Sequence, residues 1–228
     1  YQRYPTIFES GEPVVATEKL HGTFAAFCFW PGLNNSEVLN GEWFAYSKGL
    51  GSQGLVFKNN EANKNNLYQR YLVNGSIVKK LEEHFDKVWG AQRMNAFTYS
   101  RQWPITILGE IFGQGVQDLA YGQKTPTFRV FDVYVGEPGT GFYLPWEDLV
   151  KWCEQVGLDM VPTLYEGLFD EAALVALRDG KDAISNSNVR EGIVIKSSTN
   201  RVCDEIGRVM LKMVSPDYLF RKGGTEYN

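Results

Sequence analysis

The pattern of apolar residues along the chain predicts more strands than helices. Val14 to Thr17 and Thr23 to Trp30 are rich in β-branched and aromatic residues, as strands are, and they flank a tight Lys-Leu-His-Gly segment. These two runs therefore predict two strands joined by a turn at residues 19–22. Similar runs predict further strands at residues 43–47, 105–110, 128–135, 192–196 and 209–214.

Helices are predicted in three places. Apolar side chains fall on one helical face over residues 77–88 and again over residues 149–156, and Asp170 and Glu171 open a short alanine-rich helix. Stretches rich in Gly, Asn and Ser predict loops at residues 31–40, 59–66, 89–104 and 179–188. None of these loops is long enough to separate independent domains. We therefore expect one α+β unit over residues 1–228, in which antiparallel sheets face each other across a cleft.

The composition narrows the class of protein. Of the 228 residues, 43% are hydrophobic and 14% are aromatic, which suits a folded domain. No apolar run approaches the roughly 20 residues that span a bilayer, and the first residues lack the apolar core of a signal peptide, so we expect a soluble, intracellular (cytoplasmic) protein. Cys28, Cys153 and Cys203 lie far apart, without the spacing of a zinc site or a disulfide framework. The formal net charge of −4 indicates that any site for a polyanion is local.

A lysine on the predicted turn is the first candidate for chemistry. Residues 18–23 read Glu-Lys-Leu-His-Gly-Thr, in which Lys19 lies on the turn and Gly22 permits it. A neutral lysine amine can attack the α-phosphorus of a nucleoside triphosphate, form a phosphoramidate and expel pyrophosphate. A KxxG match by itself is weak evidence, because most such lysines lie in ordinary surface hairpins.

Five further motifs follow Lys19 along the chain. They are Ser47-Lys48-Gly49, Gly109-Glu110-Ile111-Phe112-Gly113, Phe128-Arg129-Val130-Phe131-Asp132, Glu191-Gly192-Ile193-Val194-Ile195-Lys196 and Leu211-Lys212-Met213-Val214-Ser215. Their order and spacing resemble the covalent nucleotidyltransferases, which include DNA ligases, RNA ligases and mRNA capping enzymes, across nearly the whole chain. His21, together with Glu18 and Thr23, is similar to the ligase 2 type of RNA ligase. Residues 214–226 resemble the subgroup in which an OB-like module precedes the nucleotidyltransferase domain, so we expect an upstream domain outside this sequence.

The resemblance implies an ATP-dependent RNA ligase with Mg²⁺ or Mn²⁺ as a cofactor. Lys19 would attack ATP to form lysyl-AMP, AMP would pass to an RNA 5′-phosphate, and a 3′-hydroxyl would displace it to seal the break. The expected partner is RNA in the form of a nicked duplex, and the expected state is a monomer. Lys19, Glu191 and Lys212 are the expected catalytic residues.

The same resemblance implies a role for each motif residue. Glu110 would accept hydrogen bonds from both ribose hydroxyls, and Phe128, in preference to Phe131, would stack on adenine. Glu191 would organise the metal ion through water, since magnesium keeps much of its hydration shell. Lys196 and Lys212 would hold the triphosphate and stabilise the charge on the α-phosphate. The full set expected to bind the cofactor is Glu18, Lys19, Gly22, Lys48, Glu110, Phe128, Lys196 and Lys212.

Several alternatives stay open at this point. The family often carries two lysines in its last motif, and here either Met210 or Val214 stands in place of one of them. His21 could contact the RNA or the metal-bound water, or only form local hydrogen bonds, whereas His84 is expected to be structural.

Three rival functions are an RNA guanylyltransferase, a DNA ligase and an inactive nucleic-acid-binding module. The intact set of Lys19, Glu110, Glu191 and Lys212 argues against the inactive module, which would have no use for all four. The basic residues that could face RNA are Lys48, Lys58, Arg201, Arg221 and Lys222.

Overall fold

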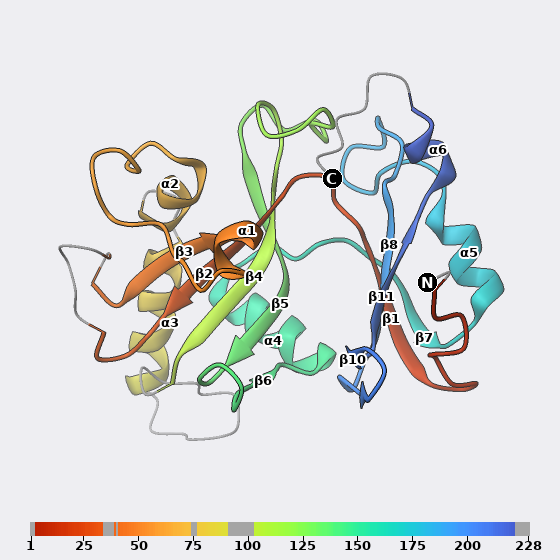
Figure 1. Cartoon of the computed structure of the whole chain (residues 1–228), viewed down its shortest axis with the longest axis horizontal. Coiled ribbons are helices and arrows are strands. Elements are labelled where there is room, and N and C mark those ends of the chain that lie inside the picture. The colour runs from red at the N-terminus through yellow and green to blue at the C-terminus, as the bar shows by residue number, and fades with distance from the viewer. Residues whose placement is uncertain (1–2, 34–38, 40, 74–76, 91–102, 222–228) are drawn as a thin grey trace.

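Two antiparallel sheets lie side by side in the computed structural model (Figure 1). The structure describes residues 3–33, 39, 41–73, 77–90 and 103–221, and of residues 87–90 only the backbone. The larger sheet has five strands in the order β3-β2-β4-β5-β6. Their bounds are β2 (Thr23–Phe29), β3 (Trp43–Ser47), β4 (Ile105–Phe112), β5 (Thr127–Val135) and β6 (Phe142–Tyr143).

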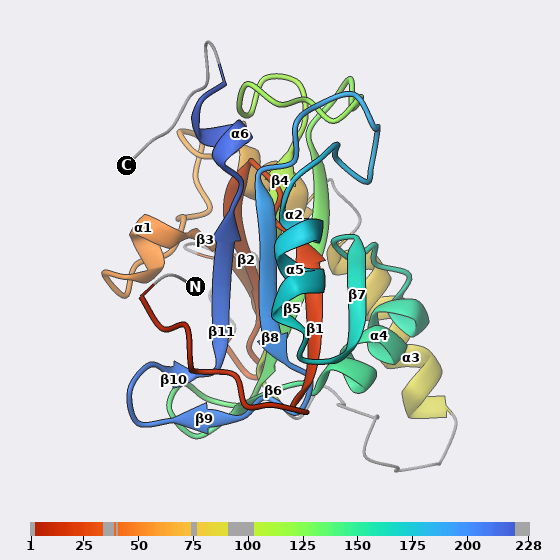
Figure 2. The ribbon, with the colours of Figure 1, turned by 90° about the vertical axis from the view of Figure 1, so that its right-hand side faces the viewer.

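The smaller sheet has four strands in the order β11-β8-β1-β7. Its strands are β1 (Pro13–Glu18), β7 (Thr163–Leu168), β8 (Gly192–Ser197) and β11 (Met210–Val214), and a separate two-stranded hairpin is formed by β9 (Val202–Cys203) and β10 (Gly207–Arg208). The helices are α1 (Lys48–Gly51), α2 (Leu67–Val73), α3 (Ile77–Gly90), α4 (Trp146–Val156), α5 (Glu171–Arg178) and α6 (Pro216–Leu219). Figure 2 shows the smaller sheet from its outer side, where α5 lies in front of the strands.

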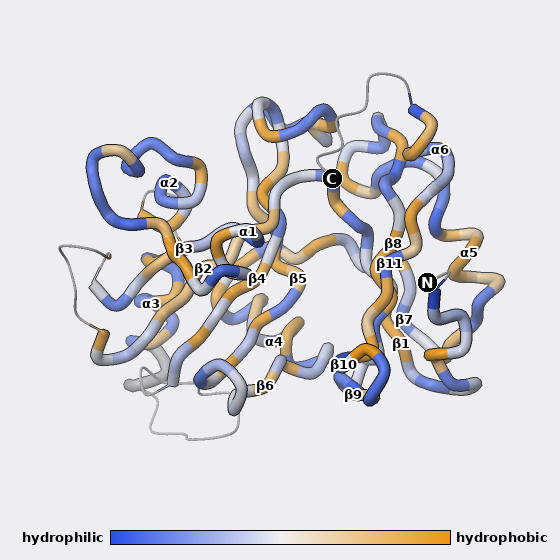
Figure 3. The backbone as a smooth tube through the Cα atoms, in the orientation of Figure 1, coloured by the Kyte–Doolittle hydropathy of each residue, from blue (hydrophilic) through white to orange (hydrophobic). Residues whose placement is uncertain are grey.

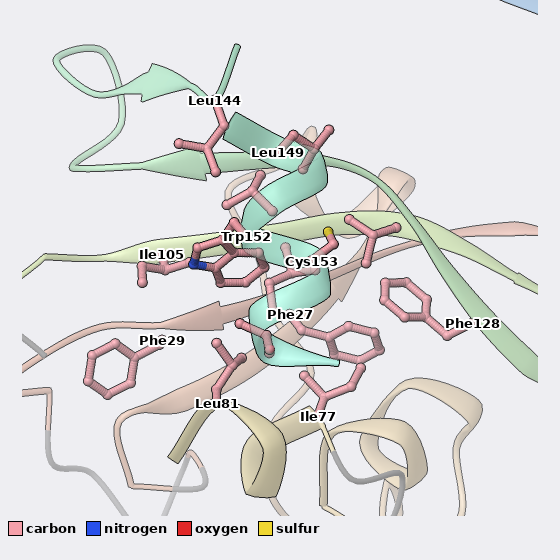
Figure 4. Packing of buried hydrophobic residues seen from close by; sticks show 14 of the residues in the cluster. Phe27, Phe29, Ile77, Leu81, Ile105, Phe128, Leu144, Leu149, Trp152 and Cys153 are labelled. Atoms are coloured by element: carbon pink, nitrogen blue, oxygen red, sulfur yellow. The ribbon is translucent and has the colours of Figure 1, made fainter. Parts of the chain in front are cut away.

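Three hydrophobic clusters hold these elements together. The largest packs α2, α3 and α4 against the five-stranded sheet, and Phe27, Phe128 and Trp152 are among its members (Figure 4). The second packs Leu174 of α5 against the smaller sheet. The third includes Tyr121 and lies beside the turn at residues 19–22. Figure 3 shows hydrophobic colours along the central strands and hydrophilic colours in the outer loops, as the burial of apolar surface requires.

The seven strands predicted from sequence are all present, and each predicted bound lies within two residues of the observed one. The three predicted helices correspond to α3, α4 and α5, and Asp170 caps α5 by accepting a hydrogen bond from the Ala173 N–H at 3.1 Å. The α+β class with antiparallel sheets is therefore confirmed. The helix α2 and the strand β7 were not predicted. The predicted loops at 31–40 and 89–104 lie largely outside the described residues.

No helix among the described residues is long and apolar enough to cross a bilayer.

Candidate active site

The turn that carries Lys19 is where the chain crosses from the smaller sheet to the larger one. β1 ends at Glu18 and β2 begins at Thr23. The Lys19 N–H donates to the carbonyl of Gly192 at 3.0 Å, which anchors the start of the turn to β8. At its other end, a Cβ built on Gly22 would lie 2.2 Å from the carbonyl oxygen of Ile111 in β4. Only glycine fits there, so the turn is fixed to both sheets.

Lys19 and Glu191 form the central contact of the site. The Lys19 ammonium donates to Glu191 Oε1 at 2.5 Å, and the two side chains are 26% and 8% exposed. Glu191 Oε2 is buried and has no hydrogen-bond partner among the described residues. Gly192 beside it has φ +149°, and a Cβ there would lie 2.2 Å from the carbonyl oxygen of Met213. This close approach of β8 to β11 needs glycine and sets where Glu191 lies.

The charges of Lys19 and Glu191 both act on the carboxyl group of Glu110. It lies on β4, where it pairs with Phe24 of β2 and Arg129 of β5. Burial raises the pKa of Glu110 to about 8, while the charge of Lys19 lowers it and the charge of Glu191 raises it further. Lys48, exposed at the start of α1, also lowers the pKa of this carboxyl. The structure therefore brings Lys19, Glu110 and Glu191 together, with Lys48 near them.

Glu18 lies buried directly before the nucleophile candidate. Its Oε2 accepts a hydrogen bond from the Ala183 N–H at 2.8 Å, and its Oε1 is buried without a partner among the described residues. Burial raises the pKa of Glu18 to about 7, against the lowering effect of the Ala183 hydrogen bond. Ala183 belongs to a loop that folds around Asp182, whose carboxylate accepts hydrogen bonds from the N–H groups of Ser185 and Asn188 at 2.5 and 2.7 Å. Within the described residues, Glu18 Oε1 is therefore a buried oxygen that is available to accept a hydrogen bond. The loop around Asp182 holds the Glu18 side chain in place through Ala183.

Lys212 is exposed on β11, opposite Val194 of β8 and two residues before the pairing of Val214 with Gly192. It therefore lies on the strand next to the one that Glu191 precedes.

His21 is held by local hydrogen bonds. Its side chain is 8% exposed, and its two ring nitrogens contact Asp118 and Tyr218. Of the two roles left open by the sequence, the structure favours local bonding. Sequence reasoning assigned no role to Asp118, Tyr121 or Tyr218, which lie about 100 and 200 residues from His21. Asp118 and Tyr121 are outside every motif, and Tyr218 lies in the stretch 214–226 without a role of its own.

Comparison with known proteins identifies the family. The model of the RNA ligase family matches residues 12–214, which is most of the chain. The chain belongs to the RNA ligase family. No curated protein matches the sequence significantly.

Solved structures of Naegleria gruberi RNA ligase share the fold of this RNA ligase family chain. A lysine-to-alanine mutant with ATP and Mn matches with a TM-score of 0.60 and 18% identity, and a lysine-to-methionine mutant with AMP and Mn matches with a TM-score of 0.62 and 18% identity. Each match covers 92% of this chain and 52% of the other. The chain therefore spans about half the length of these ligases.

Two residues expected to bind the cofactor occupy positions that do not fit that role. Phe128 is 9% exposed and packs in the main core, edge-on to Phe27 at 5.0 Å (Figure 4). Its neighbour Arg129, not Phe128, pairs with Glu110 and shares the face of that residue, because successive side chains of a strand alternate. Phe131 is half-buried, and its ring centroid lies 6.1 Å from that of Phe24.

Lys196 is the second such residue. Its side chain is 5% exposed and donates to Asp132 at 3.3 Å and to the carbonyl of Phe131 at 2.9 Å. Burial lowers the pKa of Lys196, against the opposing effect of Asp132. Asp132 also accepts hydrogen bonds from Arg208 at 2.6 and 2.9 Å. Lys196 therefore belongs to a buried ion network that connects the two sheets, and not to an open phosphate site.

The basic residues that could face RNA fall into two groups, exposed lysines and arginines that are bound to carboxylates. Lys48 and Lys58 are exposed. Arg201 is bound to Glu12 at 2.7 Å, and Arg221 is bound to Asp118 at 3.1 Å, so both have structural partners. Lys222 lies outside the described residues.

The site fits a divalent cation held in the way that magnesium prefers. Among the described residues, no group of three His, Cys, Asp or Glu side chains forms a metal cage. Magnesium needs no such cage, because it is commonly held by one or two carboxylates together with water and substrate phosphates. The buried and unpartnered Glu191 Oε2 is a suitable acceptor for this arrangement.

Proposed function

We propose that this chain is the nucleotidyltransferase domain of an ATP-dependent RNA ligase in which Lys19 becomes adenylylated. The contact between the Lys19 ammonium and Glu191 carries the proposal, because it joins a nucleophile and a proton acceptor at 2.5 Å on a turn that only glycine can complete. Membership of the RNA ligase family supports it, as do the ATP and AMP bound in the matched ligases.

In the first step, the Lys19 nitrogen attacks the α-phosphorus of ATP. The new N–P bond forms as the P–O bond to pyrophosphate breaks, and the amine must first lose a proton. Glu191 Oε1 is the acceptor within reach of that proton. A divalent cation at Glu191 would neutralise charge on the phosphates when bound.

The remaining residues hold the nucleotide. Glu110 accepts hydrogen bonds from the ribose hydroxyls, and Lys212 and Lys48 attract the phosphates. Glu18 Oε1, which has no partner in the part of the chain that the structure describes, is a buried acceptor suited to the amino group of a base.

The later steps require RNA. An oxygen of the RNA 5′-phosphate attacks the phosphorus of lysyl-AMP and releases the Lys19 amine, and a 3′-hydroxyl then attacks the 5′-phosphorus and releases AMP. We propose a nicked duplex as the substrate and a monomer as the active state. We assign these steps, as part of the proposal, to the whole protein that carries this domain; the chain spans about half the length of the matched ligases.

Sealing of labelled nicked duplexes by the full-length protein tests the proposal. Two substrates differ only in whether RNA or DNA supplies the 3′-hydroxyl strand, since the 2′-hydroxyl distinguishes them. The proposal predicts sealing of the RNA-containing nick with ATP and none in a Lys19→Ala variant. Preference for the all-DNA nick would make the protein a DNA ligase, and adduct formation with GTP alone would make it a guanylyltransferase.

A further inference from the structure

The connection between β4 and β5, residues 113–126, supplies several side chains to the turn that carries Lys19. The His21 N–H donates to the Tyr121 hydroxyl at 2.7 Å, and His21 Nε2 contacts Asp118 Oδ1 at 2.6 Å. The side-chain amide of Gln117 donates to the carbonyl of Gly22 at 3.3 Å. The connection thus contacts the main chain and the ring of His21 and the main chain of Gly22. These two residues follow Lys19 by two and three positions.

Tyr121 has an unusual backbone conformation. It is fully buried, and its φ is +51°, in the left-handed region that bulky residues rarely adopt. Such a conformation is strained and persists only where the surroundings enforce it. Its ring packs edge-on against Phe112 at 5.3 Å, which leaves the hydroxyl directed at the His21 N–H. Burial raises the pKa of Tyr121, so the group stays a neutral hydroxyl.

Asp118 determines how the His21 ring is oriented. Its carboxylate also accepts hydrogen bonds from Arg221 at 3.1 and 3.2 Å, and a carboxylate paired with a guanidinium has only acceptor oxygens to offer. His21 Nε2 must therefore carry a proton and donate to Asp118. In a neutral ring Nδ1 is then an acceptor, and it receives the Tyr218 hydroxyl at 2.7 Å. The ring cannot rotate without losing both hydrogen bonds.

We infer that Tyr121 and Asp118 are positioning residues for Lys19, acting through the main chain and the ring of His21. Lys19 is two residues from His21 on a turn that has no spare space at Gly22, so a displacement of His21 moves the amine. A misplacement of about 1 Å in a reacting group can cost about a hundredfold in rate. The inference rests on the proposed function, because the amine matters only if it reacts.

Three variants test the inference by single-turnover formation of lysyl-AMP. Tyr121→Phe removes the acceptor of the His21 N–H and keeps the ring, and Asp118→Ala removes the acceptor of the His21 ring. Asp118→Asn retains an acceptor oxygen for the ring but loses the charge that pairs with Arg221. Tyr134→Phe is the matched control, because its hydroxyl donates only to the nearby carbonyl of Glu137 in the described contacts.

The inference predicts that Tyr121→Phe and Asp118→Ala lower the maximal rate by about tenfold to a hundredfold, with the KM for ATP changed by less than about threefold. Asp118→Asn should recover most of the rate lost in Asp118→Ala, and Tyr134→Phe should react like the unaltered protein. Unchanged rates in Tyr121→Phe and Asp118→Ala would overturn the inference. So would equal losses in the Tyr134→Phe control, which would indicate a general loss of stability.

A second measurement does not depend on activity. The chain has two histidines, so nitrogen NMR of the imidazole groups can follow His21 with His84 as an internal reference. We expect a proton on His21 Nε2 in the unaltered protein and loss of that fixed state in Asp118→Ala. Absence of lysyl-AMP in the unaltered protein would contradict the proposed function alone, while a ring unaffected by Asp118→Ala would contradict the positioning role alone.

Discussion

Replacement of Gly22 by alanine should disable the site with only a moderate loss of stability. The added Cβ would lie 2.2 Å from the carbonyl oxygen of Ile111 and 3.0 Å from Cγ of Glu110. Real Cβ atoms essentially never approach another heavy atom closer than 3.0 Å, so the turn and β4 must separate by nearly 1 Å. The first contact is to backbone, which cannot swing aside as a side chain can.

The magnitude follows from two opposing effects. Overpacking of this kind costs roughly 1–3 kcal/mol. Alanine regains about 0.4–1 kcal/mol by restricting the unfolded chain, which is too little to offset the clash. For a domain of this size each kcal/mol corresponds to about 2–4 °C in Tm. The shift of nearly 1 Å acts directly on Lys19 and Glu110, so the rate of lysyl-AMP formation should fall by about a hundredfold.

The assay compares single-turnover adenylylation and thermal unfolding for Gly22→Ala and Gly49→Ala. Gly49 is the matched control, because a Cβ there meets nothing within 4 Å and alanine favours its helix α1. The control should unfold at the same temperature or slightly higher. If Gly22→Ala adenylylates itself as fast as the control and unfolds at the same temperature, the steric account of the turn is refuted.

Three further predictions concern charged residues of the site. Glu191→Gln removes the proton acceptor of Lys19, so lysyl-AMP formation from labelled ATP should slow by about a hundredfold or more; an unchanged rate would exclude Glu191 as the acceptor. Lys212→Ala should raise the KM for ATP while leaving urea unfolding within about 0.5 kcal/mol, because the side chain is exposed, and an unchanged KM would remove it from the phosphate site. Because the pKa of Glu110 is raised to about 8 from an ordinary value of 4.5, its contribution to stability is fully present below about pH 4.5 and is lost as the pH rises through 8. Urea unfolding should therefore show Glu110→Gln gaining stability relative to the unaltered protein between about pH 5, just above the ordinary value, and about pH 9, roughly a unit above the raised one. A constant difference would contradict the shift.

The sequence predicted the parts of the structure that depend on local patterns. Alternating apolar residues located the central strands, and the short segment around Lys19 indicated a turn between two of them. The contact between Lys19 and Glu191 brings together two motif residues 172 positions apart, both of which the resemblance assigns to one site.

Phe128 and Lys196 lie elsewhere than expected, because their positions depend on strand register and on long-range contacts that the sequence alone does not determine. A bulge shifts the register of β4 and β5 between Leu108 and Gly109, and Glu110 consequently pairs with Arg129 while Phe128 points into the core. Lys196 donates a hydrogen bond to Asp132, which is 64 residues away in the sequence and lies on the other sheet. A charged residue in the middle of an apolar strand, as Arg129 is, was the available signal that one face of β5 is not core.

The adenylylation of Lys19 is the central claim, and intact mass of the chain after incubation with ATP and a divalent cation tests it most directly. GTP in parallel and a Lys19→Ala variant serve as controls. We predict a mass gain equal to one AMP with ATP only, absent from the variant. A gain that persists in Lys19→Ala would place the chemistry on another residue, and no gain with either nucleotide would contradict the proposed function.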